Sequence, residues 1–164
     1  MHRLTVLCVL LLAGCGGEIE QTYQGETQSH WLAASRDNSA LTRATSVKAI
    51  ASFGNDRSLS RLREMRDDPS HVVRRLVAKA LTWVDPSISI DIYGAEVEHD
   101  WLEEGRYAML MDLEFATISA KHGYPEAYAK GIACMERLAQ GDDYFAERAK
   151  VMLESVKATP NPDQ

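Results

Sequence analysis

The sequence matches itself when it is shifted by 31 residues. The residues superimposed by this shift are Ser39 on Ser70, Leu41 on Val72, Arg43 on Arg74, Val47 on Ala78, Lys48 on Lys79, Ala49 on Ala80, Ile50 on Leu81 and Phe53 on Val84. A period of this size is typical of repeat proteins, in which each helical hairpin buries its open face on the next one. The chain is therefore expected to fold as an all-α solenoid.

Helix start and stop signals define the first copy, at about residues 37–66. Asp37-Asn38 can cap a helix whose apolar positions continue to Phe53, and Gly54 is suited to end it. Asn55 or Asp56 can then cap a second helix. The first copy is therefore expected to be a hairpin of two helices.

The second copy spans about residues 68–85. Asp68 can cap its helix, and Pro69 suits the first helical turn because its missing N–H costs nothing there. The helix is expected to run to Val84 and to end at Asp85-Pro86. Two copies are fewer than the three or so that a stable stack needs, so the rest of the chain must cap the stack.

The remaining sequence is expected to be mostly helical. Ile88, Ile90 and Ile92 alternate with polar residues, a period-two pattern that predicts a short extended connector. Residues 95–158 show helical spacing again. They predict a long helix from about Glu96 to Lys121, a second that begins at Pro125, and a third capped by Asp142 or Asp143. Residues 159–164 are expected to be a disordered tail.

The residues that repeat carry a family resemblance. The pattern Asp68-Pro69…Val73-Arg74…Ala78…Ala80-Leu81 resembles HEAT-like repeats of the short bacterial type that is related to phycobilisome lyases. The resemblance implies a HEAT/armadillo-like α-solenoid over residues 36–158, in which an Asp and an Arg stabilise the stack and the Ala-Leu pair packs it. The first copy departs from the pattern, because it has Thr42 and Ser46 where apolar residues are preferred.

The N-terminus predicts export and lipidation. Arg3 precedes a run of nine largely apolar residues, Leu4 to Leu12, which is shorter than the roughly 20 residues of a spanning helix and typical of a secretory signal. The run ends in Leu12-Ala13-Gly14-Cys15, which resembles the bacterial lipobox. This resemblance implies that residues 1–14 form a lipoprotein signal peptide, that Cys15 carries the lipid, and that residues 15–35 form a tether.

The lipobox also predicts a location. A lipidated and acylated Cys15 would hold the protein on a membrane, because two or more acyl chains anchor stably. Residue 16 is Gly, not the Asp that marks inner-membrane retention in enteric lipoproteins. The resemblance therefore implies the cell envelope, on the outer membrane facing the periplasm, where nucleic acid is not an expected partner.

Charge divides the chain into two parts. The formal net charge is −6, but residues 36–79 carry ten basic and five acidic residues, and residues 85–164 carry seven basic and sixteen acidic ones. The two parts could attract each other or different partners, or be solvated helix faces. The candidate partner-binding residues are Arg57, Arg61, Arg63, Arg66 and Arg75. The alternative is that these arginines form structural ion pairs.

No catalytic constellation is found in the sequence. It contains no Gly-rich phosphate loop, no G-x-S-x-G elbow and no paired cysteines for zinc or redox chemistry. The closest approach to a metal site is the cluster Glu96, Glu98, His99 and Asp100, which is interpreted as helix capping because acidic residues favour a helix N-terminus. Cys134 lies in an apolar helical context and is expected to be a buried, inert thiol.

Two hypotheses of different classes follow. The first is a membrane-anchored envelope lipoprotein that acts as a non-catalytic protein-interaction or scaffold module, without a cofactor. The second is an accessory domain that binds a ligand or a divalent ion through the acidic C-terminal part. A hydrolase is not favoured, because no residue can be named for its site.

Overall fold

The computed structural model describes residues 20–98 and 103–160. Within these ranges the elements are β1 (Thr22–Tyr23), β2 (Glu26–Thr27), α1 (Gln28–Ala34), α2 (Ala40–Phe53), α3 (Asp56–Glu64), the 3-10 helix η1 (Met65–Asp67), α4 (His71–Leu81), α5 (Pro86–Val97), α6 (Glu103–Ala120), α7 (Pro125–Leu138) and α8 (Tyr144–Ala158). The only strand pairing among these residues is the short antiparallel hairpin of β1 and β2. None of the described helices is long and apolar enough to cross a bilayer.

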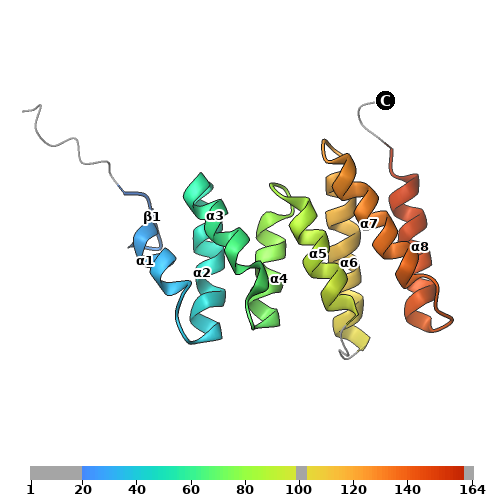
Figure 1. The fold of residues 1–164 in the computed structure, drawn as a ribbon, viewed down its shortest axis with the longest axis horizontal. Helices are drawn as coiled ribbons and strands as arrows, with labels where there is room; N and C mark the ends of the chain where they lie inside the picture. The colour runs from blue at the N-terminus through green and yellow to red at the C-terminus, as the bar shows by residue number, and fades with distance from the viewer. Residues whose placement is uncertain (1–19, 99–102, 161–164) are drawn as a thin grey trace, which may run out of the picture.

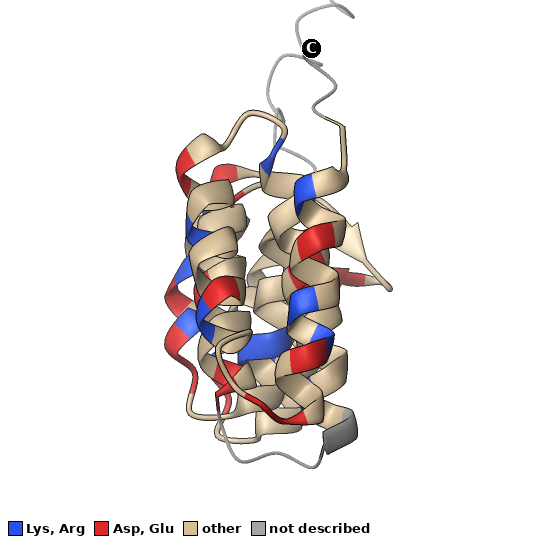
Figure 2. Cartoon of the chain, turned by 90° about the vertical axis from the view of Figure 1, so that its right-hand side faces the viewer, with Lys and Arg blue, Asp and Glu red and all other residues tan. Residues whose placement is uncertain are grey.

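The helices stack in two layers along one axis (Figure 1). Each helix packs on the next one in the sequence, and within the layers α2 also packs on α4, α5 on α7, and α6 on α8. One layer therefore contains α2, α4, α6 and α8, and the other contains α1, α3, α5 and α7. Seen along the long axis, the helices form two columns (Figure 2). This arrangement confirms the expected all-α solenoid.

Local sequence signals account for several helix boundaries, although α2 begins at Ala40 and is capped by Ser39 and not by Asp37 or Asn38. The Asn55 side chain accepts a hydrogen bond from the Ser58 N–H at the start of α3, and the Asp143 carboxylate accepts one from the Ala146 N–H at the start of α8. Gly54 ends α2 with a φ of 62°, a conformation that favours glycine. Pro125 occupies the first turn of α7. These boundaries agree with the sequence signals.

The core lies between the two layers and is continuous along the stack. Its largest fully buried side chains come from successive helices and include Ile50, Leu62, Val77, Leu81, Ile90, Tyr93, Leu110, Leu113 and Met135. Each of these side chains removes apolar surface from water, which is the main favourable contribution to folding. The C-terminal helices therefore extend the stack beyond the two sequence copies and share its core. Two copies alone are too few for a stable stack, so this extension was expected.

The segment 86–97 differs from the prediction. Ile88, Ile90 and Ile92 do not form an extended connector, because Pro86 opens helix α5, which continues to Val97. α5 packs on α4, α6 and α7, so it is buried on several sides and its apolar residues do not form a single stripe. The apolar alternation was therefore a coincidence within a buried helix.

Other expected boundaries also change. The helix of the second copy ends at Leu81, not Val84, and it begins at His71, so Asp68 and Pro69 precede it. The expected long helix from Glu96 to Lys121 is divided between α5 and α6, with residues 99–102 outside the described ranges. Consequently Glu96 lies near the end of α5 and does not open a helix.

The expected tether of residues 15–35 is too long. Residues from Thr22 onward form the hairpin and α1, and Leu32 is buried against the repeat. The Trp31 indole N–H donates to the Tyr23 carbonyl at 3.1 Å, which joins the hairpin to α1. The predicted signal peptide, Cys15 and residues 161–164 of the predicted tail lie outside the described residues.

Candidate functional site

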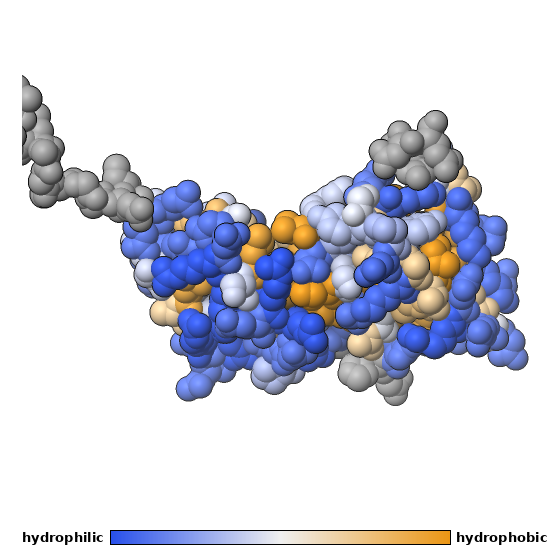
Figure 3. Space-filling model, turned by 45° about the horizontal axis from the view of Figure 1, so that its top comes forward, coloured by the Kyte–Doolittle hydropathy of each residue, from blue (hydrophilic) through white to orange (hydrophobic). Residues whose placement is uncertain are grey.

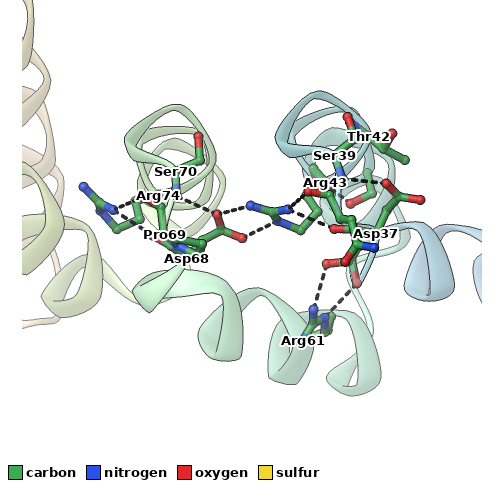
Figure 4. Close-up of polar contacts among 12 residues, drawn as sticks. Asp37, Ser39, Thr42, Arg43, Arg61, Asp68, Pro69, Ser70 and Arg74 are labelled. Carbon is green, nitrogen blue, oxygen red and sulfur yellow. Dashed lines mark hydrogen bonds and ion pairs between the residues drawn. The ribbon is translucent and has the colours of Figure 1, made fainter.

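An arginine connects each sequence repeat to the next one (Figure 4). On α2, Arg43 Nη1 donates to the carbonyls of Asp37 and Asn38 at 2.9 and 3.0 Å, which fixes the turn before its own helix. The same guanidinium donates to both oxygens of Asp68, from Nε at 2.8 Å and from Nη2 at 2.9 Å. Because Asp68 belongs to the turn before α4, this pair joins the two sequence copies.

The second repeat contains the equivalent arginine with a different acid. Arg74 Nη1 donates to the carbonyls of Asp68 and Pro69 at 2.7 and 3.2 Å, as Arg43 does one repeat earlier. Its Nε donates to Glu96 Oε1 at 2.6 Å, and Nη2 contacts the same oxygen. Glu96 comes from the end of α5, so the two arginines connect α2 to the turn before α4, and α4 to α5. We name this series of pairs, Arg43 with Asp68 and Arg74 with Glu96, the arginine ladder.

The electrostatics of the ladder follow from burial and pairing. Burial acts to raise the pKa of Asp68, but the hydrogen bonds from Arg43 and Ser70 and the charges of Arg43 and Arg74 outweigh it. The pKa of Asp68 is therefore lowered, and this carboxylate stays ionised at neutral pH. The ladder acts as a structural device that positions one repeat on the next.

Of the five candidate arginines, Arg61 is the most deeply involved in the fold. Its Nε donates to Ser35 Oγ at 2.7 Å and its Nη2 to the Ser35 carbonyl at 2.9 Å, and its side chain is only 16% exposed. Arg61 therefore fastens α3 to the end of α1. It offers little of its guanidinium to a partner.

The other candidate arginines divide into paired and exposed ones. Arg63 pairs with Asp85 at 2.9 Å, and Arg75 pairs with Asp112 of α6 at 3.0 Å. Arg66 and Arg57 lie on the exposed surface of η1 and α3, where Arg66 forms an ion pair with its exposed neighbour Asp67. The structure therefore does not gather the five arginines on one surface.

The acidic C-terminal part is also internally paired. Ion pairs within this part join Asp91 with Lys130, Glu98 with Arg137, and Glu136 with Lys157. Its other ion pairs to another element reach the basic part, as Asp112 does to Arg75. Viewed from the α8 end, basic and acidic positions are mixed along both columns of helices (Figure 2). Among the described side chains of residues 20–98 and 105–160, His, Cys, Asp and Glu form no group of three that could hold a metal ion. His99 and Asp100 of the predicted acidic cluster lie outside the described residues.

Cys134 agrees with its prediction. It is buried in α7, and burial raises the pKa of its thiol, which keeps the less reactive protonated form.

The exposed apolar side chains lie on one layer of the solenoid. Nine of the ten large exposed hydrophobic residues in the described part of the chain belong to α2, α4, α6 and α8 or to the turn after α4. These residues, which we name the apolar face, are Leu41, Val72, Leu76, Trp83, Val84, Met111, Phe115, Tyr144 and Val151. The tenth, Tyr124, lies between α6 and α7. Exposed apolar side chains that gather on one side of a protein are candidates for an interaction surface.

The centre of the apolar face is hollowed on both sides of α4. A groove of about 380 Å³ lies between α2 and α4, and a hollow of about 450 Å³ lies between α4 and α6. Both are lined by Leu76 and Lys79. Beside them, Trp83 stacks edge to face on Phe115, with ring centroids 5.4 Å apart, although the two side chains are 65% and 51% exposed.

The α4 residues of this face were not singled out from the sequence. Val72, Leu76, Lys79 and Trp83 follow one another at i, i+4, i+7 and i+11, and therefore form one stripe along α4 and the turn after it. A second apolar stripe, which includes Val73, Val77 and Leu81, is buried. A helix with two apolar stripes has more hydrophobic surface than one core can cover. This excess in α4 is the sequence signal that could have predicted the exposed stripe.

A third hollow, of about 400 Å³, lies in the other layer between η1 and α5 and contains Ile88 and Ile92. Figure 3 shows that hydrophobic residues reach the surface near the middle of the molecule. Glu96 lines this hollow, and its Oε2 is buried without a hydrogen-bond partner. Arg66, Asp67, Arg74 and Asp91 complete its charged lining.

Two layers of alternating helices, joined by one arginine per repeat, define a helical-repeat protein of the α-solenoid class. The family model of HEAT repeats matches residues 29–114, from α1 into α6. Because this span is more than half of the chain, the protein belongs to the HEAT repeats family. No match was found among curated proteins or solved structures.

Proposed function

We propose that the protein is a cell-envelope lipoprotein, anchored through Cys15, whose HEAT solenoid docks a protein partner and catalyses no reaction. The anchor would place the solenoid on the outer membrane, facing the periplasm. The lipobox at Leu12-Ala13-Gly14-Cys15 supports the anchor, and the membership of the HEAT repeats family supports the docking role. Repeat solenoids present extended surfaces to protein partners, and function must still be argued from the surface itself.

The observation that carries the docking role is the distribution of exposed apolar residues. Seven of the nine residues of the apolar face lie on helices of one layer and the other two in the turn after α4, whereas no large exposed hydrophobic residue is found on α1, α3, α5 or α7. Both layers face water in the isolated solenoid, so this one-sided distribution favours a partner that covers the apolar face. The exposed aromatic pair Trp83 and Phe115 would contribute most of the binding energy for this partner, because aromatic residues dominate binding energies at interfaces.

The proposed lipid anchor at Cys15 is tested with the variant Cys15→Ser. Without the thiol, no lipid can be attached, so we expect an unprocessed or soluble protein in membrane fractionation and an altered mobility on gels. Cys134→Ala is the matched control, because Cys134 is buried in α7 and should not affect fractionation. Unchanged fractionation and mobility of Cys15→Ser would refute the lipobox interpretation.

The docking role is tested by affinity capture from detergent-solubilised envelopes. The wild type is compared with the double variant Trp83→Ala and Phe115→Ala, and with Tyr124→Ala as the control for an exposed aromatic residue outside the apolar face. We expect one reproducible partner that is retained by the control and lost by the double variant, while circular dichroism shows that all three proteins are folded. A partner that binds all three equally, or the absence of any partner, would contradict the proposal.

A further inference from the structure

The groove between α2 and α4 combines apolar walls with charge of one sign. Its apolar lining consists of Val47, Ala51, Leu76 and Ala80, and its charged lining consists of Lys48 and Lys79. The two lysines occupy equivalent positions in the two sequence copies, so each repeat places one ammonium group at the groove.

Both lysines are exposed, and neither forms an ion pair or hydrogen bond with another residue of 20–98 or 103–160. This contrasts with Arg61 and Arg63 of the other layer, which already have acidic partners. Two neighbouring lysines without acidic partners are also unusual in a chain whose net charge is −6. The groove therefore offers two unneutralised positive charges beside an apolar floor, and such a surface attracts a complementary negative partner.

The groove also restricts the backbone conformation of its occupant. Its walls are two helices, whose backbone N–H and C=O groups are used within the helices. An extended segment would bury backbone groups against these walls without hydrogen-bond partners, whereas a helix satisfies its backbone internally. On the α4 side the groove is lined by Leu76, Lys79 and Ala80, which span about one helical turn and can contact a helical occupant.

We propose that this groove binds an acidic amphipathic helix of the partner protein. The apolar stripe of that helix would lie along α4 over Leu76, and its flanking Glu or Asp residues would pair with Lys48 and Lys79. This inference rests on the proposed docking function and adds the chemical class of the docked segment.

The test uses the mature solenoid and two synthetic peptides as probes. Both peptides have leucines at i, i+3, i+4 and i+7 spacing; one has glutamates beside the leucines and the other has lysines. Two protein variants carry the same change in charge: Lys48→Glu with Lys79→Glu at the groove, and Arg57→Glu with Arg66→Glu on α3 and η1. The second pair is the matched control, since both of its arginines are exposed on the other layer.

We expect the glutamate peptide to bind the wild type, with an affinity that decreases as salt is added. The groove variant should weaken this binding by about tenfold, because attraction at two positions becomes repulsion, and it should bind the lysine peptide better than the wild type does. The control variant should behave like the wild type. Equal binding of the two peptides, no binding of either, or a loss confined to the control variant would overturn the proposal.

A second measurement separates this inference from the docking function. A photo-crosslinking residue is placed at Leu76 in the groove, or at exposed Ser60 on α3, in protein expressed in its native envelope. Crosslinked peptides at position 76 that are acidic and amphipathic support the inference. Peptides at position 76 of another chemistry refute it but keep the docking function, and the absence of crosslinks at position 76 contradicts both.

Discussion

Arg43 and Asp68 lie 25 positions apart and form a two-point ion pair, with Nε to Oδ2 at 2.8 Å and Nη2 to Oδ1 at 2.9 Å. Their side chains are 12% and 7% exposed. The pair joins the first helix of one repeat to the turn that opens the next repeat. The family resemblance implied that an Asp and an Arg stabilise the stack, and this pair performs that task.

The first prediction concerns the removal of Asp68. Asp68→Ala leaves the Arg43 guanidinium largely buried without its acid, so we expect the free energy of unfolding to fall by about 3 kcal/mol. The adjacent Asp67 is the matched control, because its side chain is 82% exposed and contacts only Arg66. Asp67→Ala should change the stability by about 0.5 kcal/mol or less. Urea unfolding measures both, and equal effects of the two variants would contradict a structural role for the pair.

The second prediction concerns pH. The pKa of Asp68 in the folded protein lies below its ordinary value of about 3.9, because the contributions of Arg43, Ser70 and Arg74 outweigh burial. A lowered folded-state pKa contributes stability that is fully present above the unfolded-state pKa and is lost as the pH falls through the folded-state pKa.

The wild type should therefore lose stability relative to Asp68→Asn as the pH falls from about 5 to about 2. The difference between the two proteins should be largest at neutral pH and smallest at the acid end. Urea unfolding at a series of pH values measures this difference. A difference that stays constant over the whole range would show that Asp68 titrates alike in the folded and unfolded states.

The third prediction distinguishes two arginines of α3. Arg61→Ala removes the hydrogen bonds that hold Ser35, at the end of α1, and should destabilise the protein by about 2 kcal/mol. Arg57 is exposed in the first turn of α3, so Arg57→Ala should change the stability by about 0.5 kcal/mol or less. Thermal unfolding of both variants tests this difference. Equal stabilities would mean that the Arg61 contacts to Ser35 contribute nothing.

The fourth prediction concerns the close packing of α6 on α7. A Cβ atom at Gly131 would lie 2.2 Å from Thr117 Oγ1 and 2.6 Å from its Cγ2. Gly131→Ala gains about 1 kcal/mol of helix propensity, but the clash should outweigh this gain and leave a net loss of about 1–2 kcal/mol.

Thr117→Ala removes the two closest atoms, so the double variant should recover part of the loss. A double-mutant cycle measured by urea unfolding reports the coupling between the two positions. If the two single effects simply add, the contact between Gly131 and Thr117 is not the cause of the loss.

The sequence predicted those parts of the fold that depend on local chemistry. Ser39 and Ser70, Arg43 and Arg74 recur at a fixed spacing, and this recurrence was sufficient to infer a solenoid. Gly54, Asn55 and Asp143 act at helix ends through their own backbone conformation or side-chain oxygen, so their positions also followed from the sequence. The candidate site was predicted less well, because Arg61 is held by Ser35, a partner on another helix.

The sequence by itself thus determined the repeat, several helix ends and the apolar character of the stack, because these depend on residues that are close together in the chain. Only the tertiary structure decided that 86–97 is a helix, since α5 is covered by three other helices and carries no single apolar stripe. It also decided that Arg74 pairs with Glu96, and that Leu76 and Trp83 remain exposed while Val73 and Val77 are buried. The physical reason is that pairing and exposure depend on which helices meet, and the spacing of residues in the chain does not specify those contacts.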